Sequence, residues 1–384
     1  MATNPPRTWL LLGDKLGDNQ QALIVADALG WPYEVKTLRP KPEWVLGKPA
    51  FRPTLDHLDL EASDPLVPPW PDLVVTIGRR PAAAALWMQQ QAGGATRLVL
   101  IGRPKRWPER FALIVAPEQF RVAGEANVVH LGLPLIRVDE RRIEAASDAW
   151  RGRLESLPRP LTAVFVGGAT KPYVFDRPVA LALLAELERL LVRDRGTLWV
   201  TTSRRTGGSV VDVLEHRLPA GHGFYRWRVD TGTDNPYLAL LGLADRFVVT
   251  GDSVSMMVEV ARLGSPLAIF PLPVARDLGT RLRRVMVRLL DPRGPGPLAA
   301  LGGALARAGI AGYGRDLEAV HRLLIERGRA VRLGEPFPPA GEVTGLELDE
   351  VVARIRALTE LPPAPECGHA ATPVSVDIPP RPTT

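Results

Sequence analysis

The stretch FVVTGDSVSMMVEVARLGSPLAIFPL, residues 247–272, decides the fold class of this protein. Its pattern predicts a strand at 247–249, a turn at Gly251 and Asp252, a helix, and a second buried strand at 267–270. Gly264, followed closely by a proline, predicts the end of the helix. Because a strand–helix–strand unit joins parallel strands, the sequence predicts an α/β protein.

The helix within this unit has one apolar and one polar face. The apolar positions recur with helical spacing at Val254, Met257, Val258 and Ala261. We expect Ser253 to cap a helix N-terminus that points at the carboxyl edge of the sheet, where α/β proteins bind ligands and helix N-termini hold phosphates. Glu259 faces outward in this reading. Two interpretations stay open: it accepts hydrogen bonds from sugar hydroxyls, or it pairs with Arg262 on a solvated face.

Length, composition and charge limit the classes of protein to which this chain can belong. The chain has 384 residues, of which 46% are hydrophobic and 23% charged, and its formal net charge is +6. These values predict a globular protein of two domains without a membrane-spanning helix. The positive charge is spread along the chain, so we expect no nucleic-acid partner.

The cysteine count and the N-terminal segment indicate a compartment. A single cysteine, Cys367, excludes a disulfide framework and a cysteine-based metal site, which favours a reducing compartment. The N-terminal apolar run is too short for a signal peptide. We therefore expect a cytoplasmic protein, peripheral to the inner membrane if it acts on lipid.

Strands and helices alternate twice along the chain, on either side of the proline-containing linker 157–160. This predicts two Rossmann-like domains that face each other across a cleft, each a parallel sheet flanked by helices. The predicted boundaries are an acceptor-side domain at 1–156, a donor-side domain at 161–340, a C-terminal helix at 341–361, and a disordered proline-rich tail at 362–384.

The first strand, Thr8–Leu12, is followed by the polar turn 13–19. The turn is neither a dinucleotide fingerprint nor a phosphate-binding P-loop. Asp14 and Asp18 would lie at the end of the strand, where a general base is useful, although acids are also ordinary turn formers. Asn19 is expected to cap a helix at 20–29.

Three turns of the second domain are suited to phosphate: 167–171, 203–206 and 252–255. Together they offer backbone N–H groups, hydroxyls and two arginines. Arg204 and Arg205 would make bidentate contacts with a diphosphate. Three such turns in one domain favour a nucleotide or a phosphorylated ligand. Ser209 is expected to cap the helix that follows the turn at 203–206 and runs to Leu218.

Metal-ligand and nucleophile motifs are missing from the sequence. His130, His216 and His222 lack metal-ligand spacing, so we interpret them as structural or exposed. We predict no metal site.

Two other segments have distinctive compositions. Residues 39–71 are rich in proline and tryptophan and are expected to cover the site or to touch a partner. Residues 276–290 predict a basic amphipathic helix with Arg281, Arg284 and Arg288 on one face. Two interpretations of this helix stay open: its basic face contacts an anionic membrane, or it is simply solvated. Residues 291–303 are interpreted as a loop.

The chain resembles a known family at several of these motifs. SRRT at 203–206, DNPYLALLGLAD at 234–245 and VTGDSVSMMVEVARLGSPLAIF at 249–270 resemble the mitochondrial fission family named "elongated mitochondria" in plants, with its bacterial relatives. The resemblance covers roughly residues 8 to 340. The first loop departs from it, because relatives often carry Gly-His-Glu-Asn where this chain has Leu-Gly-Asp-Asn at 16–19, without a histidine base.

The resemblance implies a fold similar to that of GT-B glycosyltransferases, with two Rossmann-like domains. It implies that Glu259 binds ribose hydroxyls, with Asp252, Ser253 and Ser255 nearer the diphosphate. The candidate donor-binding residues are Gly168, Ser203, Arg204, Arg205, Thr206, Asn235, Asp252, Ser253, Ser255, Met256 and Glu259. The candidate catalytic residues are Asp18 and Asp14. The donor is a substrate, so no cofactor is expected.

Two functions from different classes follow. The first is a metal-independent glycosyltransferase that uses a nucleotide-diphosphate sugar and a lipid or lipopolysaccharide acceptor. The alternative is a non-catalytic adaptor that recruits a membrane-division partner. A nicotinamide-dependent epimerase or reductase would need a fingerprint near Gly13, which is absent.

Overall fold

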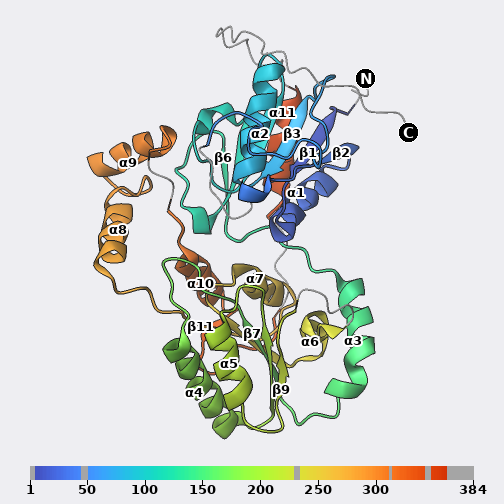
Figure 1. Cartoon of the computed structure of the whole chain (residues 1–384), viewed down its shortest axis with the longest axis vertical. Helices are drawn as coiled ribbons and strands as arrows, with labels where there is room; N and C mark the ends of the chain where they lie inside the picture. The colour runs from blue at the N-terminus through green and yellow to red at the C-terminus, as the bar shows by residue number, and fades with distance from the viewer. Residues whose placement is uncertain (1–4, 45–50, 229–233, 311–313, 342–346, 361–384) are drawn as a thin grey trace.

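The protein has two lobes stacked along its long axis (Figure 1). The computed structural model describes residues 5–44, 51–228, 234–310, 314–341 and 347–360. In this part of the chain each lobe contains a six-stranded sheet in which every pairing is parallel. The predicted fold class, two Rossmann-like domains, is confirmed.

The N-terminal sheet has the strand order β2-β1-β3-β4-β5-β6. Its strands are β1 (Thr8–Leu12), β2 (Tyr33–Thr37), β3 (Leu73–Ile77), β4 (Arg97–Ile101), β5 (Leu113–Pro117) and β6 (Val128–Leu131). Side chains alternate between its faces, so Leu10 packs beside α1 (Leu16–Leu29) while Trp9 packs on the face of α2 (Arg79–Gln91). Both faces are covered, which explains the continuous apolar runs of the strands.

The C-terminal sheet has the strand order β12-β11-β10-β7-β8-β9. Its strands are β7 (Leu161–Val166), β8 (Thr197–Thr202), β9 (Gly223–Tyr225), β10 (Arg246–Thr250), β11 (Leu267–Phe270) and β12 (Val331–Arg332). One face is covered by α4 (Arg177–Asp194) and α5 (Gly208–Arg217). The other is covered by α6 (Tyr237–Leu243), α7 (Val254–Arg262) and α10 (Leu317–Glu326). The predicted unit at 247–272 is therefore confirmed as β10-α7-β11.

Two predicted helix starts were wrong. Helix α1 begins at Leu16, four residues before the predicted start. Asn19 lies inside it, and its amide group bonds the main-chain N–H and carbonyl of Gly13 instead of capping a helix. Ser209 likewise lies inside α5, whose N-cap is Gly207.

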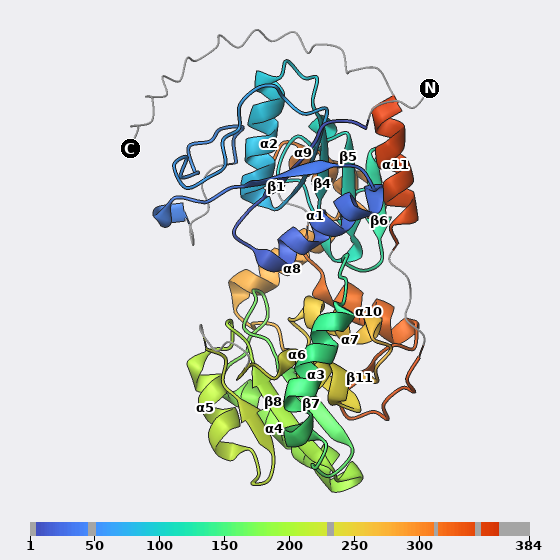
Figure 2. The same ribbon diagram turned by 90° about the vertical axis from the view of Figure 1, so that its right-hand side faces the viewer.

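The two lobes exchange helices. Helix α3 (Glu140–Leu154) follows the N-terminal sheet in sequence but packs in the C-terminal core, where Trp150 meets Trp199 edge-on with ring centroids 5.8 Å apart. Helix α11 (Asp349–Glu360) returns from the C-terminal lobe and buries Val351 and Ile355 in the N-terminal core (Figure 2). The boundaries predicted near residues 156 and 341 thus do not separate the two cores.

The segment after β11 also differs from prediction. Helix α8 (Leu278–Leu289) matches the predicted basic helix, but the loop expected at 291–303 contains the start of α9 (Pro297–Arg307). Ala306 of α9 packs into the N-terminal core.

The proline- and tryptophan-rich segment 39–71 packs on the N-terminal lobe in its described parts. Leu58, Leu66 and Trp70 join the core on the α2 face of the sheet. Residues 45–50 of this segment, the predicted disordered tail 362–384 and Cys367 lie outside the described residues. In the described ranges, no helix combines the length and the apolar character that crossing a membrane requires.

The exchange of α11 predicts that the last helix stabilises the first lobe. We expect Ile355→Ala to lower the free energy of unfolding by about 2–5 kcal/mol, because it opens a cavity in a closed core. Urea unfolding followed by tryptophan fluorescence measures the loss. Glu350→Ala, at an exposed position in the first turn of the same helix, should change stability by no more than about 0.5 kcal/mol. Equal effects of the two substitutions would contradict this packing.

Candidate functional site

Three turns meet at the carboxyl edge of the C-terminal sheet. They follow β7, β8 and β10, and β7 lies between the other two strands in the sheet. These are the three turns that the sequence marked as suited to phosphate. The structure therefore brings them together, as parallel strands require.

Asp252 ties the three turns to one another. Its side chain has no exposed surface. It accepts hydrogen bonds from the Gly168 N–H and the Thr250 hydroxyl, both at 2.8 Å, and the Arg205 guanidinium lies 3.1 Å away. Burial raises the pKa of Asp252, while these partners act in the opposite direction. The sequence placed Asp252 near a diphosphate, but its carboxylate is turned inward and holds the loops.

The turns approach too closely for side chains at 167 and 168. A Cβ on Gly168 would lie 1.9 Å from the Arg205 carbonyl oxygen, and one on Gly167 would lie 2.3 Å from an Asp252 carboxylate oxygen. The Thr206 hydroxyl donates to the Gly167 carbonyl at 2.6 Å and accepts from the Ser203 N–H at 2.9 Å. Gly168, Ser203 and Thr206 thus build the frame of the site.

The two arginines of the β8 turn have different surroundings. Arg205 reaches across the site and donates to the Thr170 hydroxyl at 2.7 Å, while 44% of its side chain stays exposed. Arg204 is exposed, and no ion pair or hydrogen bond of its side chain is seen among the described residues. The structure brings Arg205, and not Arg204, into the cluster.

The N-terminus of α7 points at the same edge. Ser253 occupies the N-cap position and is buried, but its side chain makes no capping bond. Ser255 in the first turn is exposed, whereas Met256 packs partly against the core. Because the first N–H groups of a helix lack partners within it, this end can receive an anion.

Glu259 is held by a tyrosine. Its carboxylate accepts a hydrogen bond from the Tyr237 hydroxyl at the start of α6. Burial raises the pKa of Glu259, and the Tyr237 bond opposes the shift. Burial and the Glu259 charge raise the pKa of Tyr237 well above its usual range. The Asn235 side chain accepts the Tyr237 N–H at 3.0 Å and so fixes the start of this helix.

The structure does not show Glu259 paired with Arg262 on a solvated face. Arg262 is 8% exposed, and the acid that favours its charge is Glu347. Glu259 is partly buried, not outward-facing. The sequence analysis did not predict Tyr237 as a site residue, although this tyrosine belongs to the DNPY stretch at 234–237.

The two candidate bases of the N-terminal lobe differ in environment. Asp14 forms an ion pair with Arg80 at 3.1 Å. Asp18 lies in the first turn of α1, 3.9 Å from Lys15. Burial raises the pKa of Asp18, opposed by the charges of Lys15 and Arg315. Asp18 is therefore the carboxylate whose surroundings favour its protonated form.

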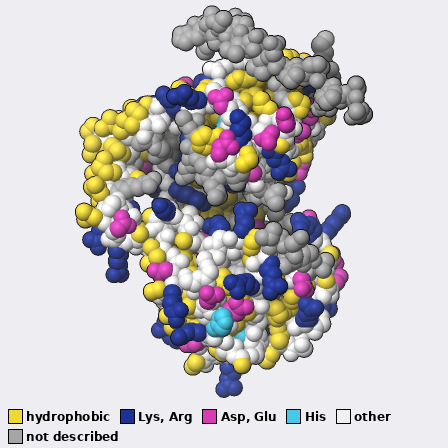
Figure 3. Space-filling view, viewed as in Figure 1, with side chains coloured by type: hydrophobic (Ala, Val, Ile, Leu, Met, Phe, Trp, Pro, Cys, Tyr) yellow, Lys and Arg dark blue, Asp and Glu magenta, His cyan; other side chains and the backbone are white. Residues whose placement is uncertain are grey.

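Arg315 connects the two lobes electrostatically and was not predicted. It belongs to the C-terminal lobe, just before α10. Its pKa is lowered by desolvation and by Arg205, and raised by Asp18, Tyr173 and Asp252. The Arg315 side chain is exposed. Figure 3 shows a hollow between the lobes that is bordered by Lys and Arg side chains. Nothing in the local sequence marks Arg315, because its neighbours are distant in sequence.

A buried histidine supports the turn after β10. His321 of α10 is 9% exposed, and its Nε2–H donates to the Gly251 carbonyl at 2.7 Å. Burial lowers the pKa of His321. His57 is also buried, and its Nε2 lies 3.2 Å from the Arg80 carbonyl. The sequence analysis singled out neither of these two histidines.

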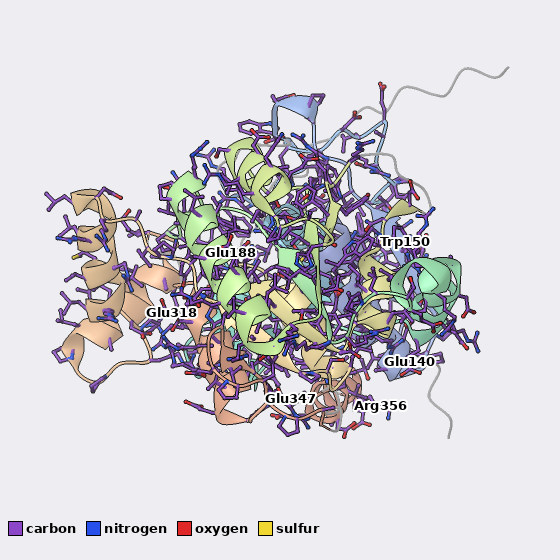
Figure 4. All side chains as sticks on the ribbon, turned by 90° about the horizontal axis from the view of Figure 1, so that it is seen from below. Glu140, Trp150, Glu188, Glu318, Glu347 and Arg356 are labelled. Atoms are coloured by element: carbon purple, nitrogen blue, oxygen red, sulfur yellow. The ribbon has the colours of Figure 1, made fainter. Side chains whose placement is uncertain are left out.

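Other features fall outside this cluster. A depression of about 460 Å³ lies along α4 and is lined by that helix alone, including Glu188, which is labelled in Figure 4. It gathers no polar groups from different elements, so it is not the candidate site. Among the described residues, no group of three or more His, Cys, Asp or Glu side chains is arranged to hold a metal ion.

The fold and this cluster define a class: a protein of two Rossmann-like domains with an arginine-lined, anion-receptive site at the carboxyl edge of the C-terminal sheet. The chain belongs to the family described as "Mitochondrial fission ELM1", whose model matches residues 17–292. The resemblance stated from the sequence is therefore confirmed.

Two relatives illustrate the span of the match. "Uncharacterized protein RP120" of Rickettsia prowazekii is 24% identical over 301 residues, which cover 69% of this chain and 83% of the relative. "Mitochondrial fission protein ELM1" of Arabidopsis thaliana is 26% identical over 221 residues. That match covers 52% of this chain and 51% of the plant protein, so the chain spans about half the plant protein's length.

Similar solved structures are more distant. UDP-N-acetylglucosamine 2-epimerase from Rickettsia bellii has a TM-score of 0.48 at 12% identity, covering 93% of this chain and 96% of that one. Arabidopsis thaliana UGT89C1 complexed with UDP-L-rhamnose has a TM-score of 0.43 at 12% identity, covering 93% and 98%.

The close approach of the loops predicts a strong effect at Gly168. We expect Gly168→Ala to displace the β8 turn and to lower the melting temperature, because the new methyl group meets a backbone carbonyl. Gly208→Ala is the matched control, since a Cβ there meets no atom within 4 Å. It should be neutral or stabilising by up to about 1 kcal/mol in the helix. A Gly168→Ala protein as stable as the control would refute the packing of these turns.

Burial of His321 predicts a specific dependence of stability on pH. Its folded-state pKa is lowered, so between that value and about 6.5 the unfolded chain binds more protons. The stabilisation is fully present above about pH 6.5 and is lost as the pH falls further, with a slope of at most about 1.4 kcal/mol per pH unit.

His321→Gln keeps a donor for the Gly251 carbonyl but does not titrate. We expect the free energy of unfolding of the variant to fall less steeply than that of the wild type below pH 6.5. Chemical denaturation across the pH range measures the free energy of unfolding of both proteins. The contributions of the other histidines are the same in both and cancel in the difference. Parallel curves would contradict a buried neutral His321.

Proposed function

We propose that this protein is a metal-independent glycosyltransferase that uses a nucleotide-diphosphate sugar. The observation that carries the proposal is the position of Arg205, which pairs with Asp252 beside the N-terminus of α7, while Arg315 interacts electrostatically with both Arg205 and Asp18 of the other lobe. Cations and a helix N-terminus on one side, with a carboxylate on the other, suit a reaction in which a diphosphate leaves while a hydroxyl loses its proton.

The donor would bind on the C-terminal lobe. Arg205 and the first turn of α7, including Ser255, would receive the diphosphate, since both stay accessible while Asp252 is enclosed. Charge that develops on the leaving diphosphate would be stabilised by fixed cations and N–H groups. Glu259 would bind ribose hydroxyls through the carboxylate oxygen that does not accept the Tyr237 bond.

The acceptor would enter from the N-terminal lobe. Asp18 would take the proton of an acceptor hydroxyl, because its raised pKa makes it a better base than an ordinary aspartate. Asp14 is engaged by Arg80 and is the weaker candidate. We propose a lipid or lipopolysaccharide hydroxyl as the acceptor.

The alternative is an adaptor that recruits a membrane-division partner. Membership of a family described by mitochondrial fission favours it. The natural partner surface, residues 39–71, packs many of its apolar side chains into the N-terminal core instead of presenting them. The presence of Arg205, Ser255 and Glu259 at the proposed donor site favours the transferase.

A thermal-shift screen tests the donor site. The purified protein is heated with UDP, GDP, CMP, ADP and their sugars. A ligand at 100 times its Kd adds about 2.7 kcal/mol of stability by mass action. We expect one base to raise the Tm and expect the shift to be lost in Arg205→Ala and Glu259→Ala. Arg189→Ala, an exposed arginine of α4, is the control that should keep it.

Two further variants sharpen the assignment. Arg204→Ala should keep most of the shift if Arg205 alone faces the diphosphate. Asp18→Asn should keep the shift but lose sugar transfer to lipid extracts, since it acts on the acceptor side. No shift with any nucleotide would favour the adaptor, whereas full transfer by Asp18→Asn would exclude Asp18 as the base.

A further inference from the structure

The hairpin formed by α8 and α9 projects from the side of the molecule beside both lobes (Figure 1). Every described side chain of α8 from Arg281 to Leu289 is exposed. Seen from the end of the C-terminal lobe, the hairpin stands apart, with side chains extending on several sides (Figure 4). Helix α8 thus contributes little to either core.

The exposed side of α8 is apolar along one face. Its members are spaced i, i+4, i+7, i+8 and i+11: Leu278, Leu282, Val285, Met286 and Leu289. Leu278 is 82% exposed and Leu282 is 65% exposed. Leu298 and Leu301 of α9 and Ile310 after it are also exposed. Hydrophobic side chains gather over this region in Figure 3. A continuous face of this kind marks an interaction surface, unlike scattered exposed leucines.

The base of the hairpin is held firmly. Arg293 pairs with Glu118 at 2.8 Å, and Arg307 pairs with Glu125 at 3.2 Å. Gly302 lets α9 approach the Leu290 carbonyl so closely that a Cβ would lie 1.9 Å from it. The face is therefore presented on a fixed support and is not an unanchored segment.

The charges beside this face select the partner. Residues 278–310 contain six arginines and one acid, Asp291, which pairs with Arg121. Arg281, Arg284 and Arg288 flank the apolar face, and none of them forms an ion pair among the described residues. A second copy of the chain would bring these cations together, whereas an anionic lipid surface complements them.

We propose that the α8–α9 hairpin docks the protein on an anionic lipid bilayer, with the apolar face of α8 in the interface and the three arginines among the headgroups. The inference goes beyond the proposed transferase activity and does not depend on it.

Flotation of the full chain with vesicles tests the proposal. The vesicles are phosphatidylcholine alone or phosphatidylcholine with phosphatidylglycerol. We expect partition into the anionic vesicles that weakens with salt. Arg281→Gln/Arg284→Gln/Arg288→Gln should lower partition on the order of 100-fold. Leu282→Gln/Met286→Gln should lower it at least about ten-fold.

The matched control is Arg189→Gln/Val192→Gln on α4, which also removes an exposed arginine and an apolar side chain, the latter 85% exposed. It should bind like the wild type. The α8 variants should keep the wild-type Tm, because the altered side chains are exposed. Failure of the wild type to bind either vesicle, or equal loss in the control, would overturn the proposal. A dimer seen by light scattering and dissociated by Leu282→Gln/Met286→Gln, without vesicle binding, would assign the face to a second copy.

Discussion

The buried carboxylate of Asp252 is the constraint on which the candidate site depends. A carboxylate removed from water is costly unless its oxygens are satisfied by donors or cations. Here the donors come from the turn after β7, from β10, and from Arg205 in the turn after β8. Moving any one turn would leave the carboxylate unsatisfied. The exposed groups of the same turns are therefore held in place without a ligand, which is what the proposed electrostatic catalysis would require.

Much of the fold could be predicted because its signals are local. The β10-α7-β11 unit has apolar runs, a helical stripe and a glycine stop within 26 residues, and the structure reproduces it. Parallel strands then imply that the turns after them share an edge. The sequence could therefore bring Gly168, Arg205 and Asp252 together. It could not say that Asp252 faces inward, because that depends on the space left by the two glycines beside it.

What was missed depends on contacts between distant segments. The composition of α9, with its prolines and glycines nearby, suggests a loop, but Gly302 permits a close approach that stabilises a helix there. Arg315 lies in the loop just before α10, and His321 lies in ordinary helical sequence. Only the packing of this segment against the turn after β10 and near the other lobe gives them their neighbours. The sequence also could not show which lobe α3 and α11 pack against. An amphipathic pattern indicates that a helix covers a core, but not which core it covers.

The return of α11 has a consequence for how the chain matures. The face of the N-terminal sheet that holds α1 is completed by Val351 and Ile355, which are among the last described residues of the chain. On the ribosome, domains generally fold in the order in which they emerge. Here the lobe that emerges first keeps an uncovered apolar face until α11 has been made, whereas α3 is made before the strands of the C-terminal lobe that it covers. The order of completion is thus the reverse of the order of synthesis.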